Sequence, residues 1–142
     1  MLRRCVLAGA LLLAVFAGPR PAAAGVVAEI SLSGQRMTVT VDGFVRHVWS
    51  VSTARRGYMT PIGSFRPERL ERVWYSTIYN GSPMPYAVFF HGGFAVHGTY
   101  ETGALGQPVS HGCVRLHPEN ARTLFELIRE HGVENSRIVI TG

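Results

Sequence analysis

Apolar and polar residues alternate along the chain directly after residue 25. In the stretch 37–42, Met and Val residues alternate with Thr and Asp, and a period of two places one side of a strand against a core. Ser33-Gly34 and Asp42-Gly43 are turn signals between such runs. The pattern therefore predicts three antiparallel strands, at 26–32, 36–42 and 44–51.

The middle of the chain predicts an extended crossing, short strands and a long loop. Residues 54–72 are rich in Arg, Gly and Pro, which favours an extended segment on the surface. Residues 99–109 form a glycine-containing loop, long enough to predict a functional lid or wall. Further β-type runs, separated by Asn80-Gly81-Ser82-Pro83 and by Gly92-Gly93, are predicted at Val73–Tyr79, Tyr86–Phe90 and Phe94–His97.

One helix is predicted near the C-terminus. Pro118 suits the first helical turn, and apolar residues between 124 and 128 follow helical spacing. Gly132 is predicted to end the helix in a left-handed conformation, and a strand follows at 137–141. The expected fold is one mostly-β domain with one substantial C-terminal helix.

The first 24 residues are typical of a secretory signal peptide. Arg3 and Arg4 precede an apolar run at 6–17, and Ala22-Ala23-Ala24 supplies a small-residue cleavage site. The apolar run is too short to span a bilayer. We therefore expect export to the periplasm or cell-wall space, no stable membrane span after cleavage, and one domain over residues 25–142.

Removal of this segment changes how the charge is interpreted. The whole chain has a formal charge of +5 and a pI of about 9.9. Such values suggest binding to a nucleic acid. Cleavage after Ala24 removes three of the fourteen basic residues, leaving eleven against nine acidic ones, a charge of +2. Phosphate binding needs a concentrated basic face, so no nucleic-acid partner is expected.

The number and position of the cysteines exclude further classes of protein. Two cysteines exclude a disulfide-dense miniprotein and a four-cysteine zinc module. Cys5 falls in the signal segment, so Cys113 is the single thiol expected in the mature protein. An unpaired cysteine is unusual in an oxidising compartment, and a nucleophilic thiol needs a neighbouring base or positive field.

Two histidines are candidates for that base. We favour His97, which ends an apolar strand, as the base, and His111, two residues from Cys113, as a bracing hydrogen-bond partner. Gly112 lets backbone and substrate approach closely, as an oxyanion site requires. The alternatives are a buried structural cysteine and structural histidines.

Two further hypotheses concern the role of Arg115 and the presence of a metal site. Arg115 could pair with a substrate carboxylate through two hydrogen bonds, and an exposed ion pair is the alternative. A zinc site is the rival to a catalytic thiol, but the His-Glu-x-x-His pattern and a nearby Asp are missing, so we expect no metal and no other cofactor. The zinc alternative would draw on His91, His97, His111, Cys113 and His117.

Together these residues resemble a known signature. The runs His97-Gly98-Thr99 and Gly106 to Leu116, which contains Ser-His-Gly-Cys-Val-Arg, are similar to the YkuD-type L,D-transpeptidase catalytic domain. Thr60 to Phe65 is similar to that family's Thr-Pro-x-Gly-x-Phe segment, and Met84-Pro85-Tyr86 resembles the approach to its catalytic histidine. The resemblance covers essentially all of residues 26–142.

The resemblance implies a β-sandwich or barrel-like domain that acts on peptidoglycan. It implies that Cys113 is the nucleophile and His97 its base. Many members have Asn at the position of Arg115, so the resemblance does not define how Arg115 contacts substrate. It further implies pocket or oxyanion roles for Ser110, His111 and Gly112, and substrate contacts for Gly98, Thr99, Tyr86 and Arg115.

The implied reaction is acyl transfer at the L,D bond before the terminal D-residue of a stem tetrapeptide. The acceptor is an amine of another stem peptide or of a protein that becomes tethered to the wall. Two alternatives stay open at this point: an L,D-peptidase that resolves the same thioester with water, and a noncatalytic cell-wall-binding domain.

Overall fold

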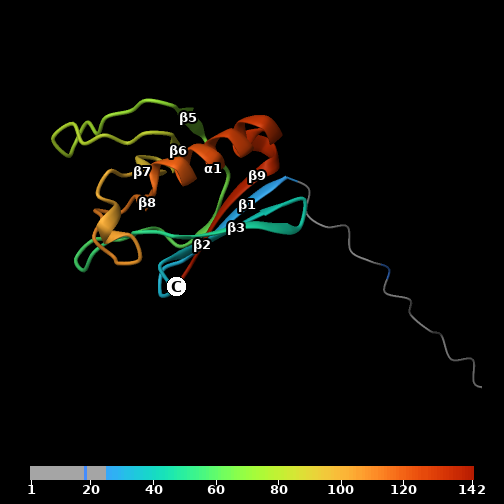
Figure 1. Cartoon of the computed structure of the whole chain (residues 1–142), viewed down its shortest axis with the longest axis horizontal. Helices are drawn as coiled ribbons and strands as arrows, with labels where there is room; N and C mark the ends of the chain where they lie inside the picture. The colour runs from blue at the N-terminus through green and yellow to red at the C-terminus, as the bar shows by residue number, and fades with distance from the viewer. Residues whose placement is uncertain (1–17, 19–24) are drawn as a thin grey trace, which may run out of the picture.

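Two β-sheets and one helix make up the part of the chain that the computed structural model describes, Gly18 and residues 25–142 (Figure 1). The predicted signal segment, residues 1–24, lies outside the described residues except for Gly18. Within the described residues, no helix combines the length and the apolar character needed to cross a bilayer.

The first sheet has the strand order β3-β2-β1-β9-β4. Its first three strands are antiparallel neighbours, which confirms the three predicted strands and their hairpins. At the β2–β3 turn, Asp42 and Gly43 both have positive φ angles, 50° and 84°, as a two-residue hairpin turn requires. The strands are β1 (Val26–Ser31), β2 (Arg36–Val41), β3 (Phe44–Ser50), β4 (Gly63–Phe65) and β9 (Ser136–Thr141).

The second sheet has the order β5-β6-β7-β8. β6 and β7 are antiparallel, whereas β7 and β8 are parallel with His97 opposite Arg115. The connection between these parallel strands includes the 3-10 turn η1 (Thr102–Ala104) and confirms that residues 99–109 form a loop. The role of this loop as a lid or wall stays a prediction. The strands are β5 (Arg69–Glu71), β6 (Ala87–His91), β7 (Phe94–Gly98) and β8 (Val114–Leu116).

The predicted helix is confirmed as α1 (Pro118–His131). It contacts β6 and β7 of one sheet and β1 of the other, so its buried side chains complete a core shared by all three layers. Gly132 ends the helix with a positive φ of 91°, as predicted, but its ψ of 146° is extended instead of left-handed helical, and the chain runs into η2 (Val133–Asn135) and β9. The buried residues of α1 are Ala121, Leu124, Phe125 and Ile128.

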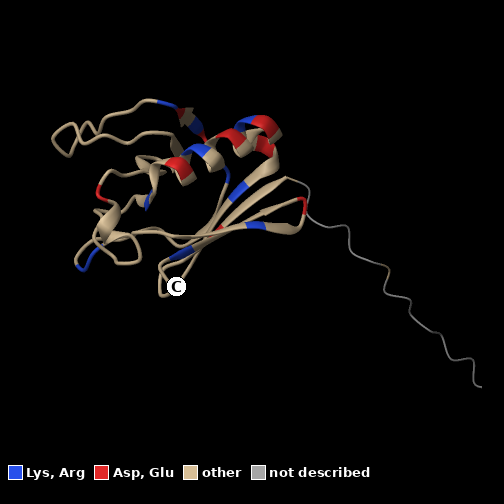
Figure 2. Ribbon diagram, viewed as in Figure 1, with Lys and Arg blue, Asp and Glu red and all other residues tan. Residues whose placement is uncertain are grey.

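Two predictions in the middle of the chain need correction. The predicted crossing at 54–72 contains β4 and β5, which pair with β9 and β6. The β-type run predicted at Val73–Tyr79 is part of a loop and not a strand. Val73 and Tyr75 stay exposed. The run pairs only loosely with residues 82–84, through a bridge from Tyr75 to Pro83 and through backbone hydrogen bonds from Met84 N–H to the Trp74 carbonyl at 2.8 Å and from Ser76 N–H to the Ser82 carbonyl at 2.9 Å. This loop from β5 to β6 projects from the second sheet (Figure 1) and carries no charge between residues 73 and 86 (Figure 2).

Candidate active site

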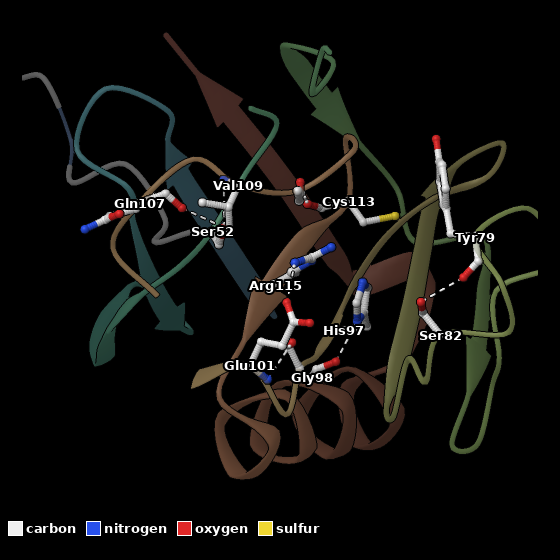
Figure 3. Close-up of polar contacts among 12 residues, drawn as sticks. Ser52, Tyr79, Ser82, His97, Gly98, Glu101, Gln107, Val109, Cys113 and Arg115 are labelled. Carbon is white, nitrogen blue, oxygen red and sulfur yellow. Dashed lines mark hydrogen bonds and ion pairs between the residues drawn. The ribbon is translucent and has the colours of Figure 1, made fainter. Parts of the chain in front are cut away.

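A pocket of about 250 Å³ opens beside β7 and the start of β8. One wall comes from the uncharged part of the β5–β6 loop, residues 73–86, through Ser76, Ile78, Tyr79, Ser82 and Met84. The other wall carries Gly93 and Phe94 together with five residues predicted from sequence to belong to the site: His97, Ser110, His111, Cys113 and Arg115. In Figure 3 the Cys113 sulfur and the His97 ring lie beside the loop that holds Tyr79 and Ser82.

His97 is buried near the end of β7, with 6% of its surface exposed. Its Nδ1 lies 2.6 Å from the carbonyl oxygen of Gly98 (Figure 3). A carbonyl only accepts hydrogen bonds, so Nδ1 carries the proton and Nε2 keeps its lone pair. The pKa of His97 is lowered to about 4, chiefly by burial; the hydrogen bond to Gly98 opposes this shift and the charge of Arg115 adds to it. The imidazole is therefore neutral at pH 7 and can accept a proton at Nε2.

Cys113 lies directly before β8 and is a free thiol. Its Sγ lies 3.9 Å from the carbonyl oxygen of Gly93, as a weak donor. Burial raises the pKa of the Cys113 thiol, although a backbone hydrogen bond from Ala95 and the charge of Arg115 both lower it. In the free protein Cys113 and His97 thus form a neutral pair, so the thiol must lose its proton as it reacts.

The turn before Cys113 is fixed by Ser110. Ser110 Oγ donates to the Cys113 carbonyl at 2.6 Å and accepts the Gly112 N–H at 3.1 Å. Gly112 has φ 140°, and a Cβ there would lie 2.7 Å from a Phe94 ring carbon and 2.9 Å from the Met59 carbonyl oxygen. Glycine is therefore required at this position for close packing. Because its N–H already binds Ser110, the oxyanion role of Gly112 stays a prediction.

Two residues that hold the backbone on either side of Cys113 were not predicted from the sequence to belong to the site. Thr60 is 3% exposed; its Oγ1 donates to the Gly112 carbonyl at 2.8 Å and accepts the Ala54 N–H at 3.1 Å. Ser52 exchanges two backbone hydrogen bonds with Arg115, at 2.8 and 3.0 Å. The segment 60–65 matches a family motif that begins with Thr, and this match could have identified Thr60 as a site residue.

His111 is held by aromatic rings. Its ring stacks on Tyr79 with centroids 4.2 Å apart and planes 10° apart, and it meets the edge of Tyr58 at 4.8 Å. Partial desolvation, followed by the charges of Arg55 and Arg115, lowers the pKa of His111. His111 therefore braces the pocket by linking two loops through its ring, whereas the sequence had suggested a hydrogen bond.

Three residues that the sequence predicts to contact substrate do not line the pocket. Gly98 donates its N–H to the Pro85 carbonyl at 2.8 Å, and Thr99 is buried and accepts the Glu101 N–H at 3.1 Å. Tyr86 packs edge-on against Phe125, with centroids 5.6 Å apart. The contact of these three residues with substrate therefore stays a prediction.

Arg115 does reach the pocket. Its Nη1 lies 3.4 Å from Glu101 Oε2 (Figure 3). As for metals, no three His, Cys, Asp or Glu side chains converge as ligands anywhere in residues 25–142. The residues of the zinc alternative are thus not gathered into a cluster there.

Comparison with known proteins gives the site a family context. A family profile of the L,D-transpeptidase catalytic domain (YkuD) matches residues 25–140. YqjB of Bacillus subtilis (strain 168), provisionally named an L,D-transpeptidase, is 30% identical over 105 residues, which are 65% of this chain and 60% of YqjB.

Solved structures agree with this match. An L,D-transpeptidase from Mycobacterium smegmatis superposes with a TM-score of 0.74 at 26% identity, covering 84% of this chain and 59% of that one. An L,D-transpeptidase from Stackebrandtia nassauensis gives 0.72 at 28% identity, covering 89% and 60%. The chain thus spans about 60% of the length of these relatives. The expected mostly-β fold is confirmed, and the chain belongs to the YkuD family of L,D-transpeptidase catalytic domains.

Proposed function

We propose that the protein is an exported L,D-transpeptidase that cleaves peptidoglycan stem peptides through a thioester on Cys113. One observation carries the proposal: Cys113 and His97 line the same pocket, and the hydrogen bond to Gly98 leaves His97 Nε2 free to accept a proton. Covalent acyl transfer requires at least a nucleophile and a base in the same site.

In the first half-reaction, the sulfur of Cys113 attacks the carbonyl carbon of the L,D peptide bond. The thiol proton passes to His97 Nε2 as the sulfur–carbon bond forms. The tetrahedral intermediate then collapses, the carbon–nitrogen bond breaks, and His97 gives the proton to the leaving amine of the terminal D-residue. The products of this step are the free D-residue and a thioester on Cys113.

In the second half-reaction, an amine attacks the thioester. His97 takes a proton from the attacking nitrogen, the new amide forms, and the sulfur leaves and regains its proton from His97. Water can take the place of the amine, so the outcome depends on how well the enzyme orients an acceptor. We place amine transfer first because the chain belongs to a family named for transpeptidation.

The walls of the pocket favour a peptide end with a free carboxylate. Met84 and Phe94 offer apolar contact, while Arg115 supplies a cation that can bind a carboxylate through two hydrogen bonds. A stem tetrapeptide has such a carboxylate on its terminal D-residue, next to the scissile bond. We assign this contact to Arg115.

The test is product analysis with a purified stem tetrapeptide. The expected result is release of the terminal D-residue by the wild-type protein, formation of a new amide when an amine acceptor is added, and neither product with Cys113→Ala. Hydrolysis alone, with no new amide at high acceptor concentration, would assign the protein as an L,D-peptidase. Unchanged product formation by Cys113→Ala would overturn the proposal.

The proposed location is the periplasm or cell-wall space, since the first 24 residues are typical of a signal peptide. The acceptor is a stem-peptide amine or an amine on a protein that becomes attached to the wall. Mass spectrometry of peptidoglycan fragments, from cells with and without the gene, distinguishes these acceptors: the deletion should remove either cross-links or a tethered protein.

A further inference from the structure

Among the described residues, four that are not glycine have a positive φ angle: Gln35, Asp42, Asn80 and Tyr86. Asp and Asn tolerate this conformation, whereas for a bulky side chain it is an outlier. Tyr86, with φ 53°, is the only aromatic residue of the four and lies directly before β6. Backbone strain of this kind concentrates at functional sites, because it persists only where surrounding contacts hold it.

Two neighbours hold the ring of Tyr86. The ring packs edge-on against Phe125 of α1, and the Arg72 guanidinium carbon lies 5.8 Å from its centroid. The same guanidinium carbon lies 5.3 Å from the centroid of Phe125, and Arg72 Nη1 lies 2.9 Å from Glu126 Oε1 on α1. The helix therefore anchors the Tyr86 ring, and through it keeps the strained backbone conformation in place.

The peptide group between Pro85 and Tyr86 connects two separate parts of the second sheet. Its N–H donates to the carbonyl of Arg72, directly after β5, at 2.9 Å, and its carbonyl oxygen accepts the N–H of Gly98, the last residue of β7, at 2.8 Å. The φ angle of Tyr86 describes rotation about its N–Cα bond, so it sets the direction of this peptide group relative to the anchored ring. At φ 53° the group reaches both partners at once.

Gly98 is the residue whose carbonyl oxygen lies 2.6 Å from His97 Nδ1 (Figure 3). Two hydrogen bonds orient it: its own N–H donates to Pro85, and the Thr99 N–H, in the same peptide group as the Gly98 carbonyl, donates to the Leu116 carbonyl at 2.8 Å. Gly98 also packs tightly, because a Cβ on it would lie 3.1 Å from Pro85 Cγ. The direction of the carbonyl that holds the His97 proton thus depends on the contact with Pro85.

We propose that Tyr86 is a positioning residue for His97, whose ring-anchored, positive-φ conformation directs the Pro85 carbonyl to Gly98 and thereby keeps the Gly98 carbonyl on Nδ1. This inference rests on the proposed function and deepens it. While the Gly98 carbonyl stays in place, Nδ1 carries the proton and Nε2 can accept one from Cys113. When that carbonyl turns away, the proton can move to Nε2, which then has no lone pair for the thiol proton. Tyr86 does not line the pocket, so it acts only through these contacts.

Three substitutions of Tyr86 separate its backbone conformation from the packing of its ring. Tyr86→Phe keeps the ring. Tyr86→Ala and Tyr86→Gly both remove it, but glycine adopts a positive φ without strain and alanine does not. If Tyr86 only filled space, the glycine variant would be at least as damaging as the alanine variant, because it leaves the larger void and the more flexible backbone. Positioning through φ predicts the opposite order.

Two further variants complete the set. Arg72→Gln removes one anchor of the ring at a side chain that is half exposed, so it leaves the core intact. Leu32→Ala is the control for lost packing, because Leu32 is half-buried directly after β1, in the other sheet, and packs against the same core.

The first measurement is ¹⁵N NMR of histidine-labelled protein without substrate, which reports the nitrogen of His97 that carries the proton; comparison with His97→Gln assigns the signal. We expect the Nδ1–H tautomer in the wild type, Tyr86→Phe and Leu32→Ala, and a mixture of tautomers in Tyr86→Ala. Arg72→Gln should show a smaller share of the Nε2–H tautomer than Tyr86→Ala.

The second measurement is steady-state kinetics with a stem tetrapeptide. We expect Tyr86→Ala to lower kcat about ten- to hundredfold, as a misplaced catalytic group does, with little change in KM. Tyr86→Gly should recover about fivefold of that loss, the factor for relief of left-handed strain. Tyr86→Phe should restore kcat, and Leu32→Ala should leave it close to the wild-type value.

A wild-type tautomer of His97 in Tyr86→Ala, or in Arg72→Gln should Tyr86→Ala fail to fold, would overturn the inference. So would a kcat in Tyr86→Gly no higher than in Tyr86→Ala, or an equal loss of kcat in Leu32→Ala. Failure of the proposed function is a separate outcome: it would be seen as absent product with wild-type protein, whereas the NMR measurement uses the resting protein and involves no chemical step.

Discussion

Thr60 donates a buried hydrogen bond to the carbonyl of Gly112, with Oγ1 and the oxygen 2.8 Å apart. The same hydroxyl accepts the N–H of Ala54, so one side chain joins the segment after β3 to the turn before the nucleophile. The position of the Cys113 sulfur therefore depends on a residue 53 positions earlier in the chain.

Thr60→Val keeps the shape of this side chain and removes its hydroxyl. One buried and one partly buried backbone group then lack partners, so we expect about 1–3 kcal/mol lower free energy of unfolding and a lower kcat with little change in KM. Thr60→Ser, which keeps the hydroxyl, should restore kcat. Denaturant titration and steady-state kinetics provide the measurements, and a fully active Thr60→Val would contradict the positioning role.

The buried, neutral His97 makes stability depend on pH. Its folded pKa is about 4, below the ordinary value of about 6.5, so the unfolded state binds more protons between these values. The His97 contribution is thus fully present above pH 6.5 and lost as pH falls towards 4, a decrease of up to about 3 kcal/mol in free energy of unfolding.

Chemical denaturation at a series of pH values measures this slope. His97→Gln should flatten it between pH 4 and 6.5, while His47→Gln, on β3 of the other sheet, should keep it. An equal slope in wild-type protein and His97→Gln would show that other groups cause the pH dependence.

The charge of Arg115 affects the reactivity of the Cys113 thiol by lowering its pKa. Burial raises the pKa of Cys113, and the charge of Arg115 opposes that rise. Alkylation by iodoacetamide should therefore increase with pH to a midpoint above the ordinary cysteine value of about 8.5, and Arg115→Gln should move the midpoint further upward. A midpoint below 7 in the wild-type protein would instead indicate a preformed thiolate.

The stack of Tyr79 on His111 fastens the β5–β6 loop over the pocket. Such aromatic pairs contribute about 0.5–1.5 kcal/mol, so Tyr79→Ala should raise the donor KM several-fold and speed hydrogen exchange of residues 74–84. Tyr79→Phe keeps the ring and should behave like wild type. Tyr75→Ala, at an exposed position on the same loop, is the control, and an equal KM increase there would remove the role of the stack.

Local pattern was sufficient for most of the fold. The alternation at 37–42 and the Asp42-Gly43 turn specify a hairpin by themselves, and the apolar spacing within α1 specifies the helix. The run at 73–79 was misread because apolar residue types were taken as a sign of burial: Trp74 packs edge-on against Phe89, but Val73 and Tyr75 are exposed.

The sequence was sufficient to predict the residue types of the candidate site, but not how they are arranged in space. Cys113 and His97 stood out because a lone thiol near histidines calls for a chemical explanation. The parallel register that sets His97 opposite Arg115 and the stack of Tyr79 on His111 join residues distant in sequence, and local pattern carries no information about such contacts. For the same reason, local pattern could not show that Tyr86 packs against Phe125.

Intact-protein mass spectrometry during turnover tests the central claim most directly. After brief incubation with a stem tetrapeptide, we expect a mass increase equal to the peptide without its terminal D-residue, located on Cys113 by peptide mapping and lost when an amine acceptor is added. His97→Gln should form this adduct far more slowly, and Cys113→Ala should not form it. Release of the D-residue by wild-type protein with no adduct at Cys113, or with an adduct at another residue, would contradict the account.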